Sequence, residues 1–129
     1  MNNDDNFIIK MEKYSKKVNN IPDYSVSILP DGTILYKGTE NINSSKIQHK
    51  ISEGSLGQLI DEFIDIYFFA LNDKYTNDTD NNMPKMEISV KWQNKHKKVV
   101  FDNSSQVPTR LAEFQKLIEK TLGISQSST

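Results

Sequence analysis

Alternation of apolar and polar residues predicts several β-strands along this chain. A period of two places apolar side chains on one face of a sheet and polar side chains on the other. In the first such stretch, Phe7, Ile9 and Met11 lie on one side, and Lys10 and Glu12 on the other. The expected strands span residues 7–12, 24–28, 34–36, 47–51, 86–92 and 97–101.

Two of the gaps between these strands have the composition of tight turns. Pro30-Asp31-Gly32 presets φ at the proline and allows a positive φ at the glycine, so the chain should reverse there. A second reversal is expected near Asn94-Lys95. The sequence therefore predicts two hairpins, one near each end of the chain.

Two stretches show helical periodicity instead. From Ser55, which forms a possible capping box with Gln58, apolar residues recur at helical spacing as far as Tyr67. A second apolar stripe follows Pro108, a residue suited to a first helical turn, and stops at Gly123. The polar stretch between the first helix and the next strand, residues 72–82, is expected to be a loop.

The order of these elements is typical of an α+β fold, a mostly antiparallel sheet of about six strands with two helices packed on one face. At 129 residues the chain suits one domain, which we place at residues 6–123. Residues 1–5 and 124–129 are expected to be flexible ends.

Composition excludes several kinds of chemistry. The chain has no cysteine, so disulfides and zinc–thiolate sites are excluded, and its net charge is −1. No apolar run is long enough for a membrane helix, and the start lacks the features of a signal peptide. These observations predict a cytoplasmic protein without a membrane span.

The strongest metal candidate is Asp78-x-Asp80-x-Asn82, which copies the first ligand positions of a calcium-binding loop. The match ends there, because Met83 stands where the loop requires glycine and Ser89 where it requires glutamate. We favour a solvated polar loop and assign no metal and no cofactor.

No arrangement of residues indicates catalysis. His49 shares the apolar side of its expected strand and is interpreted as a partly buried structural histidine, whereas His96 is interpreted as a turn residue. Trp92, Tyr24 and Tyr36 are candidates for ligand stacking, but each lies on the apolar side of a strand, which favours core packing. We therefore expect no enzyme.

Charge is segregated in a way that the net charge hides. The outer side of the first helix is acidic, whereas alternation gathers lysines with few acidic residues on the open face of the sheet. Such a face suits an anionic partner, although lysines on an exposed sheet also prevent edge pairing. The candidate binding residues are Lys10, Lys37, Lys46, Lys50, Lys85, Lys91 and Lys98.

The run Pro22-x-Tyr24-x-Val26-x-Ile28 with Asp31-Gly32-Thr33-x-x-Tyr36-x-Gly38 resembles the opening of a prokaryotic family, domain of unknown function 6438. Later features occur in the same order as in that family. They are Leu59 with Phe63, Phe68-x-x-Leu71-x-x-x-Tyr75, Thr79-Asp80, Lys98-Val99 and Pro108-x-x-Leu111.

The resemblance covers roughly residues 14–122 and implies a compact α+β module, often associated with the bacterial envelope, with no known activity. Members often carry a cysteine pair and an arginine before the Pro-x-Tyr segment. Here the cysteine positions match Lys17 and Ile21, and Tyr14 or Lys13 stands near the arginine position. Any bridge or ligand that depends on those cysteines is absent from this chain.

The sequence thus favours a small non-catalytic binding or interaction module, a monomer or weak homodimer, that contacts an unknown protein or anionic partner through the open face. One alternative is a metal-dependent or hydrolase-like enzyme that uses the 72–82 loop. Another is a binder of nucleic acid or an anionic ligand.

Calcium addition tests the metal candidate directly. A ligand that binds only the folded state raises the melting temperature by mass action. Because Met83 and Ser89 occupy the positions that require glycine and glutamate, we expect millimolar calcium to leave the melting temperature unchanged. A calcium-dependent rise that is lost in Asp78→Asn with Asp80→Asn, and that magnesium does not reproduce, would contradict this interpretation.

Overall fold

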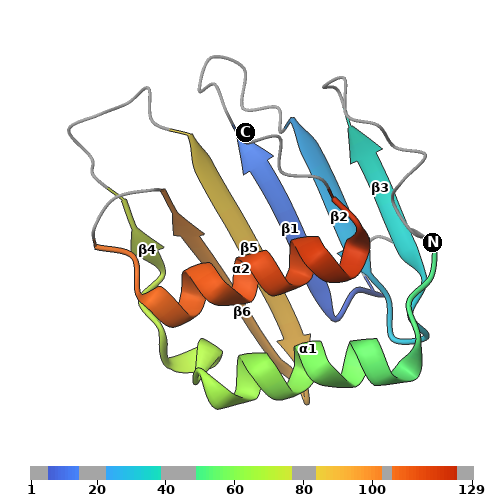
Figure 1. The fold of residues 1–129 in the computed structure, drawn as a ribbon. Helices are drawn as coiled ribbons and strands as arrows, with labels where there is room; N and C mark the ends of the chain where they lie inside the picture. Colours follow the sequence, from blue (N-terminus) through green and yellow to red (C-terminus); the bar gives the residue numbers. More distant parts are fainter. Residues whose placement is uncertain (1–5, 15–22, 39–48, 77–83, 103–105, 125–129) are drawn as a thin grey trace.

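Two helices pack on one face of a mostly antiparallel sheet, as the alternation predicted (Figure 1). The computed structural model describes residues 6–14, 23–38, 49–76, 84–102 and 106–124. Its elements are β1 (Ile9–Tyr14), β2 (Tyr24–Ile28), β3 (Ile34–Gly38), α1 (Glu53–Asp65), the short 3₁₀ helix η3 (Phe68–Ala70), β4 (Lys74–Tyr75), β5 (Lys85–Trp92), β6 (Lys95–Phe101) and α2 (Thr109–Leu122).

The order of the strands in the sheet is β3-β2-β1-β5-β6-β4. Strand β1 pairs antiparallel with β2 on one side and with β5 on the other. The N-terminal meander and the C-terminal hairpin therefore join into one sheet through β1. Among the described strands, only the edge pair of β4 and β6 is parallel. Among the described residues, no helix is long and apolar enough to cross a membrane.

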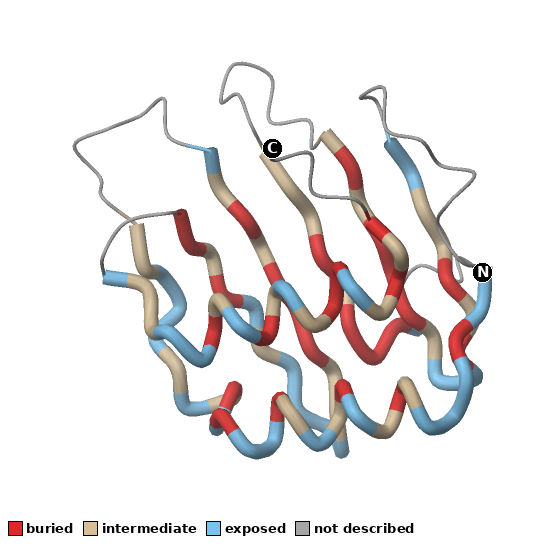
Figure 2. Tube along the Cα trace, viewed as in Figure 1, coloured by how far each residue is buried: buried red, intermediate tan, exposed pale blue. Residues whose placement is uncertain are grey.

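The core lies between this sheet and the two helices (Figure 2). Alternate residues of β1, β2, β5 and β6 meet the apolar faces of α1 and α2 there. Burial of this apolar area is the main favourable contribution to folding. The largest fully buried side chains are Phe63, Phe68, Phe114, Ile9, Met11, Ile28, Leu59, Ile88, Leu111, Ile118, Leu122 and Val26.

The helix ends are set by local hydrogen bonds. The N-cap of α1 is Ser52, three residues before the predicted cap at Ser55, and the Ser52 hydroxyl accepts a hydrogen bond from the Ser55 amide at 3.0 Å. Helix α2 ends at Gly123, which has the left-handed φ of 78° that was expected of a glycine cap.

The turn between β2 and β3 forms where the sequence predicted it. Gly32 has a φ of 90°, and its amide donates to the carbonyl oxygen of Leu29 at 2.9 Å. The Asp31 carboxylate accepts a hydrogen bond from the Thr33 amide at 2.9 Å, and this bond lowers the pKa of Asp31. These two hydrogen bonds close the reversal at Pro30-Asp31-Gly32.

The predicted strand at 47–51 is reduced, in the part that the structure describes, to a single antiparallel bridge with backbone hydrogen bonds from Ile34 to His49 and from Ile51 to Gly32. Residues 46–48 lie outside the described residues, and only Lys50 forms a bridge, opposite Thr33. His49 is exposed, so the interpretation as a partly buried histidine is wrong. Ile51 alone enters the core, because the chain turns there into the cap of α1.

Strand β4 replaces it as the sixth strand, within a stretch that was predicted to be loop. It has two residues and pairs parallel with the end of β6. The amide of Val100 donates to the carbonyl of Asp73 at 2.9 Å, and Lys97 forms an ion pair with Asp73 at 2.6 Å. A strand of two residues is too short to show alternation in the sequence. It is recognised only by its pairing with β6.

Two glycines of this fold should respond in opposite ways to alanine. A Cβ on Gly32 would lie 2.5 Å from the backbone oxygen of Ile51, at a positive φ, whereas a Cβ on Gly57 in α1 would meet no atom within 4 Å. We expect Gly32→Ala to lower the free energy of unfolding by roughly 1–3 kcal/mol. Gly57→Ala should raise it by about 0.5–1 kcal/mol.

Chemical denaturation followed by circular dichroism measures both changes. Gly57→Ala is the control, because it makes the same chemical change at a site with space and helical φ. Equal effects of the two substitutions would show that the contact between Gly32 and Ile51 does not constrain the turn.

Candidate binding surfaces

Strand pairing decides which of the predicted lysines share a surface. Ser27, Lys10, Ser89 and Lys98 form one continuous row across β2, β1, β5 and β6. Adjacent rows add the remaining lysines, all on the side of the sheet that the helices do not cover (Figure 1). We call this surface the lysine-rich face; its described lysines are Lys10, Lys37, Lys74, Lys85, Lys91 and Lys98.

Two of the seven predicted lysines, Lys46 and Lys50, are not among these six. Lys46 lies outside the described residues. Lys50 lies opposite Thr33 beyond the start of β3, near enough to Asp31 to help lower the pKa of that carboxyl. Lys74, on β4, was not predicted, because its strand was not.

The centre of the lysine-rich face holds a pair of glutamates. Glu12 on β1 and Glu87 on β5 are direct cross-strand partners, and the Lys98 ammonium lies 3.3 Å from the Glu87 carboxylate. Burial raises the pKa of Tyr14 to about 12, with Glu12 and then Glu87 as the further causes. The face is therefore basic with an acidic centre, not uniformly basic.

Phe7 lies against this face, and the prediction that it shares the core side of Ile9 and Met11 is wrong. Its ring meets the His96 ring edge-on at 6.1 Å, and the Lys91 ammonium stands 4.5 Å from its centroid. Alternation fails here because β1 begins only at Ile9. Phe7 is 7% exposed, so it covers part of the face and leaves its ring little surface for a ligand.

The helix layer has mixed charge. Helix α1 carries Glu53 in its first turn and no base in its last turn, as the predicted acidic surface requires. Helix α2 carries Arg110, Lys116 and Lys120, all exposed. Opposite charges therefore face away from each other at α1, which is acidic, and the lysine-rich face. They do not at α2, which carries the three basic residues.

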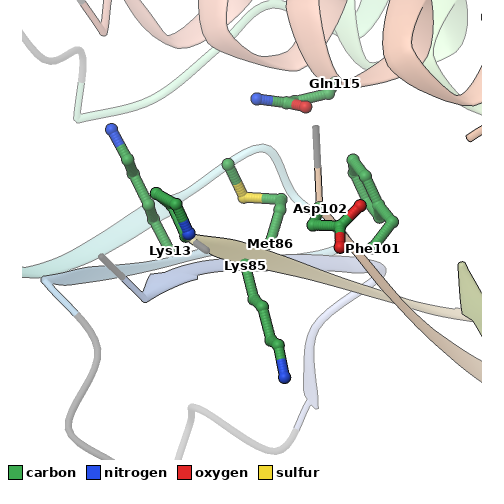
Figure 3. Close-up of a pocket in the computed structure, with 7 residues that line it drawn as sticks. Lys13, Lys85, Met86, Phe101, Asp102 and Gln115 are labelled. Atoms are coloured by element: carbon green, nitrogen blue, oxygen red, sulfur yellow. The ribbon is translucent and has the colours of Figure 1, made fainter. Parts of the chain in front are cut away.

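A small polar pocket lies between α2 and the sheet, next to Pro84 (Figure 3). Lys13, Asp102 and Gln115 are on its walls, whereas Lys85 points away from α2. Its volume of about 120 Å³ is below the range of about 300–1,000 Å³ that small-molecule sites occupy. No histidine is among its described lining residues, so the described part of the site does not contain the carboxylate–histidine pair of a hydrolase.

The metal candidate was predicted on the polar loop that follows β4. Asp78, Asp80 and Asn82 lie outside the described residues. Within the part of the chain that the structure describes, no three His, Cys, Asp or Glu residues gather closely enough to hold a metal ion.

Tyr24 packs in the core, as predicted. It is 2% exposed, and its ring is stacked on the ring of Tyr36 at 6.1 Å. Gly38 makes room for this stack, because a Cβ there would lie 2.3 Å from the Tyr36 hydroxyl. Burial, followed by the charge of Glu119 on α2, raises the pKa of Tyr24. Tyr24 is thus a core residue, and its ring has no open surface on which a ligand could stack.

Glu12→Gln should lower the pKa of Tyr14, because it removes one of the two negative charges that oppose phenolate formation. The raised pKa favours the protonated phenol in the folded state. Its contribution to stability is complete below pH 10 and is lost as the pH rises towards 12. Between pH 10 and 12, the free energy of unfolding should fall less in Glu12→Gln than in the unmodified chain.

Phenolate absorbance during alkaline titration measures the pKa, and Tyr14→Phe identifies the signal of Tyr14. Ser25→Ala, a neutral change beside Glu12 on β2, is the control. An unchanged Tyr14 titration in Glu12→Gln would mean that the glutamate pair does not act on this phenol.

Comparison with known proteins adds the family. No curated protein matches the chain. The model of the family described as Domain of unknown function (DUF6438) matches residues 10–122, which spans the sheet from β1 onwards and both helices. The α+β architecture and the family match agree with what the sequence motifs indicated, and the chain belongs to the DUF6438 family.

Proposed function

We propose that this chain is a non-catalytic interaction module whose lysine-rich face receives an acidic segment of a partner protein. The observation that carries the proposal is the strand register, which brings lysines from β1, β3, β4, β5 and β6 onto one face. Neighbouring strands lie about 4.8 Å apart, so these ammonium groups form a continuous field of positive charge.

The acidic centre favours a protein partner over nucleic acid. Glu12 and Glu87 lie among the six lysines of the described face, and the Lys98 ammonium is 3.3 Å from the Glu87 carboxylate. A peptide can place a basic or neutral residue over Glu12 and Glu87 and acidic residues around them. A phosphate backbone carries negative charge at every step and would meet the glutamates with repulsion.

Aromatic side chains on the lysine-rich face also give little support to nucleic acid as the partner. Base recognition on a sheet relies on aromatic rings that are open to solvent. The Phe7 ring beside Lys91 is almost fully buried, and the Tyr14 ring on the same face is half-buried. Nucleic-acid binding is therefore an outcome of the test below and not the proposal.

Among the described residues, no observation favours the enzyme alternative, and residues 77–82 of its loop lie outside them. The pocket beside Pro84 holds a carboxylate and an ammonium group, but it is small and its described lining lacks histidine. The cytoplasmic location and the monomeric or weakly dimeric state stay predictions.

Removal of lysines from the face should weaken the binding of an acidic peptide. Lys10→Gln, Lys37→Gln and Lys85→Gln together remove three charges from β1, β3 and β5. An exposed ion pair contributes roughly 0.2–1 kcal/mol. The triple variant should therefore bind a fluorescent peptide of mixed glutamate, glycine and serine about tenfold more weakly in anisotropy titrations at low salt.

The matched control is Arg110→Gln, Lys116→Gln and Lys120→Gln on α2, which makes the same change in net charge on the opposite layer. It should bind like the unmodified chain. Equal losses in both variants would show only a general charge effect and would overturn the assignment of the face. Tighter, salt-sensitive binding of a single-stranded oligonucleotide than of the peptide would overturn the choice of partner.

A further inference from the structure

An aromatic groove opens at the C-terminal end of α1, between α1, η3 and the tip of the β5–β6 hairpin. Its volume is about 350 Å³, which lies within the range of about 300–1,000 Å³ for small-molecule sites. The residues on which the following argument depends are Phe63, Ile64, Tyr67, Phe69, Trp92 and Lys95.

Apolar side chains are exposed around this groove to an unusual degree. Ile64 is 47% exposed and Tyr67 is 75% exposed, and these two are the large exposed hydrophobic residues of the described chain. Both line the same groove. Single exposed apolar residues need no explanation, but two that border one concave surface indicate a site of contact.

The conformation of Tyr67 strengthens this inference. Its φ of 55° and ψ of 50° are left-handed, a region that non-glycine residues seldom adopt. Two hydrogen bonds hold the Tyr67 backbone in this conformation. The Tyr67 amide donates to the Ile64 carbonyl oxygen at 3.0 Å, and the Tyr67 carbonyl oxygen accepts from the Ala70 amide at 2.8 Å. The fold thus maintains a strained backbone that leaves an aromatic ring in solvent, and such strain clusters at functional sites.

The other aromatic rings form a rigid wall. The Phe63 ring meets Trp92 at 5.9 Å and Phe69 at 6.3 Å, in both cases edge to face. Phe63 is fully buried and anchors the half-buried Trp92 and Phe69. The tight hairpin turn at Gln93 and Asn94, both with positive φ, limits the movement of Trp92 at the rim.

Among the described residues that line the groove, Lys95 is the charged one. The Lys95 ammonium stands 5.7 Å from the centroid of the Phe69 ring, at the edge of the apolar wall. Asp61 and Asp65 on α1 are exposed and are not among the lining residues. A ligand that fills the groove would therefore meet apolar rings and one positive charge.

We infer that the groove binds a small aromatic carboxylate. The ring of the ligand would stack against Trp92 and Tyr67, and its carboxylate would pair with Lys95. The site is separate from the lysine-rich face, because Trp92 and Lys95 are partners on the helix-facing side of the hairpin, whereas Lys91 and His96 are partners on the other side. The inference therefore stands or falls without the proposed function.

Tryptophan fluorescence tests the groove directly, because Trp92 is the single tryptophan of the chain. The probes are phenylpropionate, its neutral amide and phenethylamine, which share a ring and differ in charge. We expect phenylpropionate to change the Trp92 emission saturably at millimolar concentration. The amide and the amine should bind at least about tenfold more weakly, because neither pairs with Lys95.

Two variants separate the parts of the site. Lys95→Gln should abolish the preference for the acid over the amide without loss of amide binding. Tyr67→Gly, which retains the fold because glycine adopts a positive φ freely, should weaken both probes by about tenfold. Lys116→Gln on α2 is the charge-matched control and should change neither affinity.

Three results would overturn the inference. The first is the absence of a saturable emission change with phenylpropionate. The second is binding of phenethylamine as tight as that of the acid, which would assign a cation site. The third is emission that depends on protein concentration without a probe, together with a dimer in sedimentation that Tyr67→Gly abolishes, which would assign the groove to a second copy.

Discussion

The antiparallel pairing of β1 with both β2 and β5 is the constraint on which the other features depend. Met11 on β1 lies between Val26 and Ile88, and Lys10 lies between Ser27 and Ser89. One register therefore directs an apolar row to the helices and a polar row to the opposite face. A slip by one residue would exchange the two faces, so burial of the core and display of the lysines have the same cause.

That register also sets the electrostatics of the exposed face. Glu12 and Glu87 are distant in sequence and become direct neighbours only because β5 returns beside β1. Their repulsion is moderated by Lys98, at 3.3 Å from Glu87, and their field contributes to the raised pKa of Tyr14. This mixed pattern of charge is the reason for proposing an acidic peptide as the partner and not a polyphosphate.

The aromatic groove has a different origin. It forms where the end of α1, η3 and the β5–β6 hairpin meet, and its exposed ring depends on the left-handed backbone of Tyr67. The core supplies the rigidity, because Phe63 contacts both Phe69 and Trp92 from a fully buried position. The two candidate surfaces thus lie on opposite sides of one hairpin.

The sequence by itself determined the fold class, the two helical stripes, the turn at Pro30-Asp31-Gly32 and five of the seven lysines on one face, because each depends on local periodicity or on one residue's φ preference. Tertiary structure alone decided the rest. Phe7 does not lie on the core side, because β1 begins only at Ile9. Strand β4 is defined only by its pairing with β6. The glutamate pair, the cap at Ser52 and the groove around Tyr67 likewise arise from contacts between segments or from backbone geometry that alternation does not encode.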